Sequence, residues 1–168
     1  SAVIIISLAI GIACINLIFL FLKRELSTDS FHEYKDQIYL LKSDDPWLPG
    51  KKLYYCKFGS AEFMKTNFAQ VENFCRFSSS NPLKIVVDNE EYFDDTKIIS
   101  ASQNFFGFFS YRLLTNNPGT ALETSNNVVI SADLAKKYFG DKDPVGKIIT
   151  LDYRDKQDLM TVTGIFEK

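Results

Sequence analysis

Apolar and polar positions divide the sequence into two unlike parts. The twenty-one residues from Ala2 to Leu22 include no charged residue, proline or histidine. At about 1.5 Å per residue, a helix over this run would reach roughly 31 Å, which is about the thickness of a bilayer's hydrocarbon core. A backbone in lipid must satisfy its own hydrogen bonds, and a helix does so. The pattern predicts a transmembrane helix over residues 1–22.

Three other interpretations of this apolar run are open: a cleaved secretion signal, a lipoprotein signal and a core helix of a soluble protein. A secretion signal has a shorter apolar core that ends in small residues at a cleavage site. Here Ile15 to Leu22 stay apolar past the small residues, although Gly11-Ile12-Ala13-Cys14 loosely resembles a lipoprotein signal. A helix from the core of a soluble protein would be shorter and interrupted by polar residues. The run fits a membrane span better than any of these alternatives.

Small and polar residues inside the run are candidates for helix packing in the membrane. Ser7 and Gly11 are four residues apart, a spacing at which small residues let a second helix approach closely. Asn16 is a polar side chain deep in the run, and it would be more stable with a partner than facing lipid. Small residues are also common in membrane spans generally. These three positions are therefore hypotheses about further helices that this sequence does not contain.

Residues 23–37 follow the run without a glycine or a proline. Apolar residues recur in them at helix-like intervals, so the membrane helix can continue as a stalk helix that transmits tilt between the bilayer and the domain. Ser27 or Asp29 could instead cap a separate helical turn. The stalk candidates are Glu25, Leu26, Asp29, Phe31 and His32.

The remaining residues, 38–168, alternate short strand-like and helix-like patterns. The clearest helix is 131–139, where Ser131 can cap the first turn, lysines stand near the end and Gly140 terminates it. The segments 83–99 and 147–166 each predict a hairpin around a polar turn. Further predicted strands are 38–41, 53–58, 71–78, 111–114 and 128–130, and further predicted helices are 60–68 and 102–110. This irregular mixture predicts an α+β domain.

Composition narrows the function without identifying it. The chain has 168 residues and a net charge of −2, with scattered lysines and arginines, so nucleic-acid binding has little support. Fifteen phenylalanines and eight tyrosines suit strands and a well-filled core. Cys56 and Cys75 lie outside the apolar run. They could form a disulfide if the domain is extracytoplasmic, which the sequence leaves open.

Candidate catalytic chemistry is sparse. His32 is the only histidine, and no cluster of His, Cys and carboxylate residues has the spacing of a metal site. The hairpin predicted over 83–99 has a cluster of acidic residues, which are Asp88, Glu90, Glu91, Asp94 and Asp95. Paired carboxylates can act in acid–base catalysis, but an acidic hairpin tip is usually just solvated. The sequence has no phosphate-binding loop or Ser-His-Asp set. We predict a membrane-anchored, non-catalytic module without catalytic, cofactor-binding or metal-binding residues.

Two stretches of the sequence resemble a known family. Residues 8–41, LAIGIACINLIFLFLKRELSTDSFHEYKDQIYLL, are similar to the opening of the permease subunits of MacB/FtsX-type ABC transporters. Residues 126–152, NNVVISADLAKKYFGDKDPVGKIITLD, followed by TVTGIF, resemble the same family's periplasmic core domain. The resemblance covers Ala2 to Tyr39 and Phe105 to Phe166, and the middle of the chain matches only loosely.

The resemblance implies a mixed-sheet, porter-like α+β domain that follows a first transmembrane helix on the periplasmic side of the inner membrane. Lys23 and Arg24 alone leave this orientation undecided, because the other flank of the run is missing. In the family, cytoplasmic ATPases dimerise on ATP, and their motion passes through membrane and stalk to the periplasmic domains. The implied partners are a cytoplasmic ABC ATPase that holds the ATP, a second permease copy or homologous subunit, a periplasmic adaptor and the lipid membrane.

The sequence lacks ATPase motifs and stops after TVTGIF, where the family continues with more core domain and three more membrane helices. We therefore expect a fragment or truncated relative that does not transport by itself. Its periplasmic domain would transmit ATP-driven motion to the export or extraction of a substrate. The alternative is a membrane-tethered extracytoplasmic ligand-sensing domain, and a third hypothesis is an anchored hydrolase that uses Asp94 or Asp95.

Overall fold

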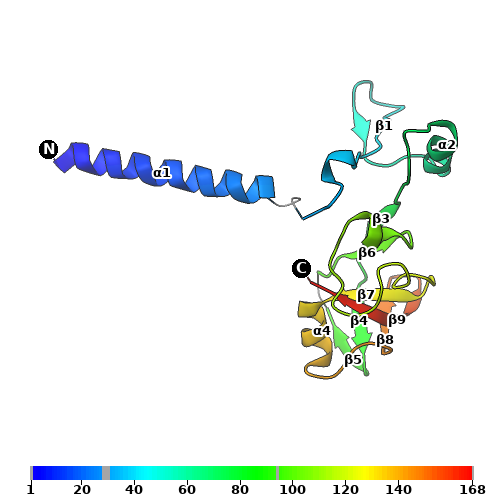
Figure 1. Ribbon diagram of the computed structural model, residues 1–168. Helices are drawn as coiled ribbons and strands as arrows, with labels where there is room; N and C mark the ends of the chain where they lie inside the picture. Colours follow the sequence, from blue (N-terminus) through cyan, green and yellow to red (C-terminus); the bar gives the residue numbers. More distant parts are fainter. Residues whose placement is uncertain (1, 28–30, 94, 168) are drawn as a thin grey trace. The chain divides into compact units, whose positions relative to one another are not determined.

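The computed structural model describes residues 2–27, 31–93 and 95–167 of the chain. It divides into two units, residues 1–39 and residues 40–168. The first unit is built around one long helix, and the second contains a five-stranded sheet (Figure 1). Asp29 and Asp94, which the sequence singles out, lie outside the described residues.

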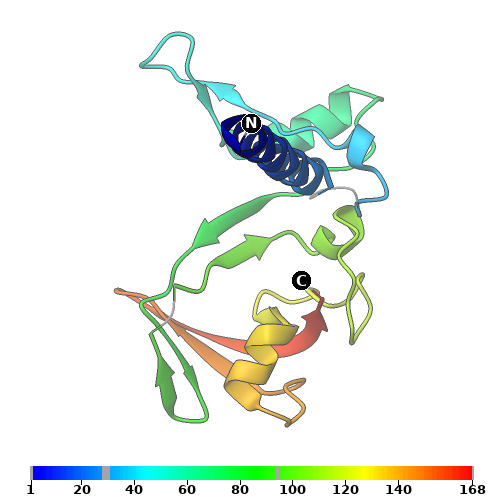
Figure 2. The ribbon, with the colours of Figure 1, turned by 90° about the vertical axis from the view of Figure 1, so that its left-hand side faces the viewer.

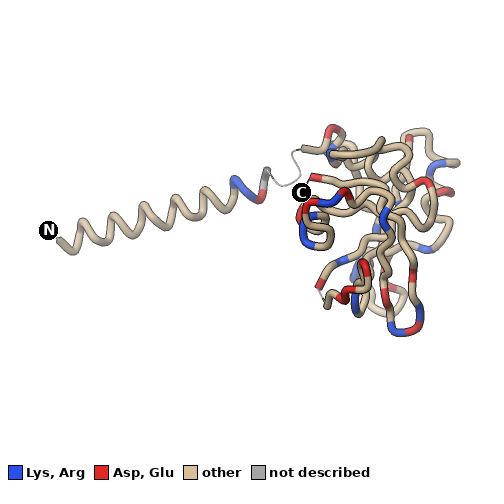
Figure 3. Tube along the Cα trace, turned by 90° about the horizontal axis from the view of Figure 1, so that it is seen from below, with Lys and Arg blue, Asp and Glu red and all other residues tan. Residues whose placement is uncertain are grey.

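Helix α1 (Ala2–Ser27) contains the apolar run and confirms the predicted helix, which continues five residues beyond Leu22. Aliphatic and aromatic side chains surround it on every side and are exposed from Val3 onward. Its charged residues are confined to its C-terminal end, at Lys23 to Glu25 (Figure 3). A helix that is apolar all round is either buried in a protein core or spans a membrane.

The predicted stalk helix over residues 23–37 is wrong in its second half. After α1, residues 31–34 form turns, and η1 (Lys35–Gln37) is a single 3-10 turn. Tyr34, which precedes η1, has φ −108° and ψ 29°, so no α-helix leads into this turn. Residues 27–30 read Ser-Thr-Asp-Ser, and these side chains compete for backbone hydrogen bonds, which makes them poor residues for a helix interior.

The described residues of the second unit form three α-helices and nine strands. The helices are α2 (Ser60–Asn67), α3 (Phe105–Phe108) and α4 (Ala132–Phe139). The strands are β1 (Ser43–Asp44), β2 (Lys52–Leu53), β3 (Phe77–Ser80), β4 (Lys84–Val87), β5 (Glu90–Tyr92), β6 (Ile98–Ala101), β7 (Asn127–Ser131), β8 (Ile148–Asp152) and β9 (Gln157–Phe166). They make two ribbons, β1–β2 and β3–β6, and a mixed sheet in the order β5-β4-β8-β9-β7. The α+β class is confirmed.

Alternating side chains build the inner face of the five-stranded sheet. Successive residues of a strand point to opposite faces, so every second residue faces the core. Ile85 and Val87 of β4, Ile149 and Leu151 of β8, and Val162 of β9 are all almost completely buried. Strand β8 pairs antiparallel with both β4 and β9, whereas β7 joins β9 in parallel. The β8–β9 pair confirms the hairpin that the alternation at the end of the sequence predicts.

Helix α4 packs on this face of the sheet (Figure 2). The Ser131 hydroxyl accepts a hydrogen bond from the backbone N–H of Leu134 at 3.3 Å, which satisfies one of the free donors at the helix start. Tyr138 and Phe139 are buried among the sheet residues, and the chain leaves the helix at Gly140 with φ +62°. The predicted helix, its cap and its end are all confirmed.

An aromatic cluster joins the β3–β6 ribbon to the five-stranded sheet. Phe77 of β3 meets Phe105 and Phe109 edge-on, with ring centroids 6.4 Å and 5.8 Å apart. Tyr111 stacks on Phe105 at 5.8 Å and meets Phe166, at the end of β9, at 6.1 Å. Each such pair is worth about 0.5–1.5 kcal/mol beyond the burial of area, so the cluster holds the ribbon on the sheet.

The hairpin predicted over 83–99 is right in its first arm only: β4 pairs with β5, and Ile98–Ala101 forms β6, which pairs with β3 instead. Four more predicted strands and one predicted helix also differ from the structure. The segments are 38–41, which lies in no strand; 53–58, of which only the first residue is in β2; 71–78, where β3 starts at Phe77; 111–114, which makes one isolated bridge from Leu113 to Phe166; and 102–110, of which α3 covers four residues. Aromatic and aliphatic runs favour strands locally. A strand also needs a neighbour for its backbone hydrogen bonds, and local patterns do not show which segments find one.

Gly164 in β9 is packed too tightly to accept a side chain without movement. A Cβ atom at this position would lie 3.2 Å from the backbone oxygen of Thr115. Thr115 and Asn116 form a segment that crosses β9, here called the crossing segment, and two hydrogen bonds hold it there. The backbone N–H of Ile165 donates to Thr115 Oγ1 at 2.9 Å, and Asn116 Nδ2 donates to the carbonyl of Thr163 at 2.8 Å. The crossing segment therefore cannot move away freely.

We expect Gly164→Ala to destabilise the second unit by about 1–3 kcal/mol, because the new methyl group meets backbone rather than a flexible side chain. Denaturant unfolding of the purified chain measures this loss. Gly107→Ala is the matched control. It adds the same methyl group within α3, where no atom lies within 4 Å, so stability should stay unchanged or rise. Equal stability of the two variants would show that the crossing segment moves away from the new methyl group without a loss of folding free energy.

Candidate functional site

Helix α1 is long and apolar enough to cross a membrane. The candidate membrane span runs from Ala2 to Glu25, 24 residues, and none of it is buried inside the protein. At 1.5 Å per residue this span is about 36 Å long, slightly more than the hydrocarbon core of a bilayer. Among the residues that the structure describes, α1 is the one helix with this length and composition.

The three packing candidates lie on α1 but not on one face of it. With about 3.6 residues per turn, Gly11 is about 40° from Ser7 around the helix axis, whereas Asn16 is about 180° from Ser7. Ser7 Oγ donates a hydrogen bond to the carbonyl of Ile4 at 3.0 Å, so its hydroxyl is satisfied within the helix. A second helix that packed on Ser7 and Gly11 would leave Asn16 on the opposite face.

The stalk candidates fall on both sides of the end of α1. Glu25 is exposed near the end of the helix, and Leu26 follows it within α1. Phe31 and His32 lie in the turns before η1, with ring centroids 3.9 Å apart and ring planes at 42°. Asp29 is outside the described residues. The structure thus places Glu25 and Leu26 in the helix, and Phe31 and His32, whose rings are in contact, in the turns before η1.

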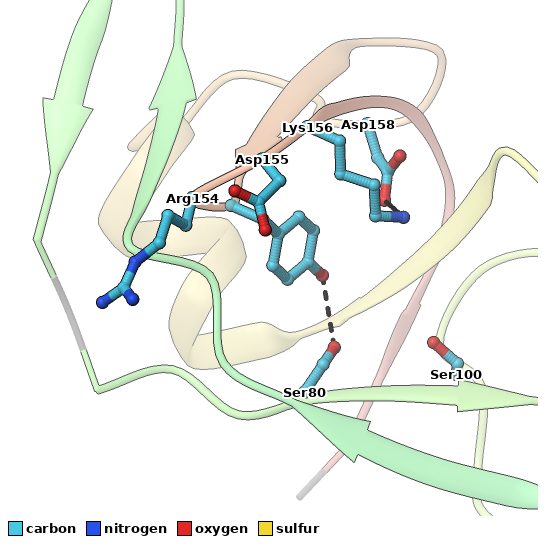
Figure 4. A pocket seen from close by; sticks show the side chains of 7 residues that line it. Ser80, Ser100, Arg154, Asp155, Lys156 and Asp158 are labelled. Atoms are coloured by element: carbon cyan, nitrogen blue, oxygen red, sulfur yellow. Dashed lines mark hydrogen bonds and ion pairs between the residues drawn. The ribbon is translucent and has the colours of Figure 1, made fainter.

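A pocket in the second unit has no signal in the sequence. It has a volume of about 500 Å³ and lies between the β3–β6 ribbon and the turn that joins β8 to β9 (Figure 4). Its lining residues are Ser80, Ser100, Tyr153, Arg154, Asp155, Lys156 and Asp158. The ribbon and the turn are far apart in the sequence, so only the packing of the ribbon beside the sheet brings these polar groups together.

Tyr153 connects the two walls of this pocket. Its hydroxyl lies 3.2 Å from Ser80 Oγ of β3, and Lys156 Nζ lies 5.3 Å from the centre of its ring. Lys156 also donates a hydrogen bond to Asp158 at 2.7 Å, and this bond raises the pKa of the lysine. The pocket therefore offers hydroxyl and charged groups, which are suited to hydrogen-bonding a small polar ligand.

Lys84 of β4 links its strand to both neighbouring strands of the five-stranded sheet. Its Nζ lies 2.6 Å from Glu91 Oε1 on β5 and 3.8 Å from Asp152 Oδ2 on β8. The hydrogen bond to Glu91 is the main cause that raises the pKa of Lys84 above 10.5. A raised lysine pKa favours folding while the group is protonated. The contribution is complete below the unfolded-state pKa and is lost as the pH rises through the folded-state value.

Comparison with protein families matches the whole chain to one of them. A family model described as the MacB-like periplasmic core domain matches residues 1–168. The chain belongs to this family. The match confirms the resemblance seen in the two sequence stretches and assigns the chain to a permease family of ABC transporters. This MacB-like core domain is of a kind that is generally non-catalytic.

Two solved structures are similar to this MacB-like core domain. A domain of a Porphyromonas gingivalis protein assigned as a permease is 25% identical, with a TM-score of 0.59 over 70% of this chain and 48% of that one. The periplasmic region of MacB from Actinobacillus actinomycetemcomitans is 16% identical, with a TM-score of 0.46 over 56% of this chain and 42% of that one. The chain thus spans less than half the length of either structure. Comparison with curated proteins finds no match.

The other candidate groups of the MacB-like core domain lie away from the pocket. Asp88 is exposed at the turn between β4 and β5, and Glu90 is exposed at the start of β5, where it accepts a hydrogen bond from Tyr92 at 2.9 Å. No three His, Cys, Asp or Glu residues of the described chain come together so that they could hold a metal.

Cys56 and Cys75 are free thiols, so the disulfide that the sequence leaves open is not formed. Burial raises the pKa of Cys75.

Proposed function

We propose that this MacB-like core domain is the membrane-anchored periplasmic part of an ABC transporter permease subunit in the inner membrane. In this proposal α1 is a membrane span of the subunit, and the domain transmits cytoplasmic ATP-driven motion to the export or extraction of a substrate. The observation that carries the proposal is the continuity of α1. The helix runs without a break from its apolar run through Lys23 and Arg24 to Ser27.

Continuity matters because a helix is stiff over its length, whereas a flexible linker absorbs displacement. The apolar part of α1 suits lipid on all sides, and its charged end suits the water at the membrane surface (Figure 3). A tilt or shift of the span would therefore reach the first residues outside the bilayer. The turns at residues 31–34 then act as the joint between the span and the domain.

The proposal assigns each chemical task to a different chain. ATP is bound and hydrolysed by a cytoplasmic ABC ATPase, so this chain needs no cofactor of its own. A second permease copy or homologous subunit completes the membrane part, and a periplasmic adaptor can dock outside. The family match supports the transporter context of these partners.

The coupling can be tested in the full-length permease reconstituted with its ATPase. A fluorophore on Leu159→Cys, an exposed position of β9, in a chain whose native free cysteines are replaced by serine, should report a change between the ATP-bound and ADP-bound states. Glu25→Pro should abolish this change while ATP hydrolysis continues, because proline breaks the helix at a cost of about 3 kcal/mol. Glu25→Ala keeps the helix and should keep the response. A proline variant that responds like the wild type would rule out transmission through α1.

The pocket favours a second candidate function, in which the domain is tethered to the membrane and senses a ligand outside the cytoplasm. The hydroxyl and charged groups that line the pocket are of the kind that bind a polar molecule. The complete reading frame distinguishes the two proposals. Three further apolar spans after the domain support the permease, whereas a signalling domain on the cytoplasmic side of α1 supports the sensor.

A further inference from the structure

Two large apolar side chains stand exposed at the tip of the β1–β2 hairpin. Trp47 is 88% exposed and Leu48 is 52% exposed. Trp47 is also the only tryptophan in the chain. Leaving such side chains in water forgoes the free energy that their burial would supply, so their exposure side by side indicates a surface that contacts something else.

The hairpin presents this pair on an ordered turn. The backbone N–H of Trp47 donates to Asp45 Oδ1 at 2.9 Å, and the N–H of Lys51 donates to the carbonyl of Leu48 at 3.1 Å. A proline stands on each side of the pair, which restricts the backbone further. The tip is therefore preorganised, and inserting it elsewhere would cost little conformational entropy.

The residues that flank the two strands of the hairpin, at the end opposite the tip, also have the composition of a membrane interface. Tyr54 and Tyr55 follow β2 and are 73% and 68% exposed, and Lys42 Nζ lies 4.7 Å from the centre of the Tyr54 ring. Residues 42–57 carry four lysines and two aspartates, a net charge of +2, whereas the whole chain carries −2. Tryptophan and tyrosine concentrate at the boundary between lipid and water, and lysines are attracted to anionic headgroups.

We propose that the β1–β2 hairpin inserts Trp47 and Leu48 into the interface of the membrane that α1 crosses, with its lysines among anionic headgroups. The proposal rests on the membrane anchoring of α1. The 22 steps along the chain from Glu25 to Trp47 can span at most about 75 Å, so the anchor keeps the hairpin at a high effective concentration near lipid. The contact would give the domain a second attachment and thereby fix its orientation on the bilayer.

The single tryptophan reports directly on this contact. The full chain is reconstituted in nanodiscs of phosphatidylcholine and phosphatidylglycerol, with acyl chains either brominated or unmodified. Brominated chains should quench most of the Trp47 emission, and iodide in the buffer should have little access to it. Emission that iodide quenches and bromine does not would overturn the proposal. Emission that neither quenches would overturn it too, because it would show that protein rather than lipid covers the tip.

Two reporter variants separate this proposal from the anchoring on which it rests. Phe19→Trp combined with Trp47→Phe moves the reporter into α1, where bromine should quench it if the helix spans the bilayer. Quenching at position 19 but not at Trp47 would leave the anchor intact and refute the hairpin contact, and quenching at neither would refute both. Leu159→Trp with Trp47→Phe is the matched control on the exposed face of β9, and it should stay unquenched. Equal quenching at 159 would show unspecific adsorption and refute the proposal.

Discussion

Val162→Asp should unfold the second unit, with a loss of more than about 4 kcal/mol. Val162 is completely buried, and it packs in the core with Ile149, Leu151 and Tyr138. A carboxylate at this position would replace apolar contacts with a buried charge that water cannot solvate. Because domains of this size are stable by about 5–15 kcal/mol, such a loss removes much of the total.

Circular dichroism during thermal unfolding measures the effect of this substitution. Leu159→Asp is the matched control, since it places the same charge on the same strand at a side chain that is 63% exposed. The control should change the stability by no more than about 0.5 kcal/mol. Wild-type stability of Val162→Asp would mean that β9 does not face the core as described.

Ile10→Arg combined with Ala13→Arg should release the chain from the membrane. Each arginine near the centre of a membrane helix costs about 2.5–3.5 kcal/mol on insertion scales, so the pair costs roughly 5–7 kcal/mol. Both positions lie in the middle of α1, too far from its ends for the guanidinium groups to reach water easily. The wild-type chain should stay in the membrane fraction after alkaline extraction, and the double variant should appear in the supernatant.

The control for the double variant is Ile10→Leu with Ala13→Leu, which alters the same positions but keeps the segment apolar. This chain should remain in the membrane fraction. If the arginine variant also resists extraction, the hydrophobicity of α1 is not what retains the protein, and the anchoring would have to come from another part of it.

Elements set by local patterns could be predicted from the sequence. The apolar run predicts α1, the cap at Ser131 and the stop at Gly140 predict α4, and alternation predicts the β8–β9 hairpin. Each depends on residues close together in the chain. The extension of α1 from Leu22 to Ser27 shows the limit of this reasoning, because hydrophobicity marks where lipid would end and not where the helix ends.

Features that depend on distant segments could not be predicted. The strand expected at 71–78 starts only at Phe77, because the residues from there onward are the ones that pair with β6. The pocket forms between that ribbon and the turn after β8, and no motif links Ser80 to Tyr153. The sequence identifies Trp47 as the only tryptophan, but only the hairpin geometry shows its exposure.

The central proposal is that α1 crosses the bilayer and holds the globular unit on the periplasmic side. Alkaline phosphatase and green fluorescent protein, each fused after residue 168 and expressed in bacteria, test it most directly, because the phosphatase is active only in the periplasm and exported fluorescent protein stays dark. We expect active phosphatase and a dark fluorescent fusion, both in the membrane fraction. A bright fluorescent fusion with inactive phosphatase, or a chain that is soluble without detergent, would contradict the account.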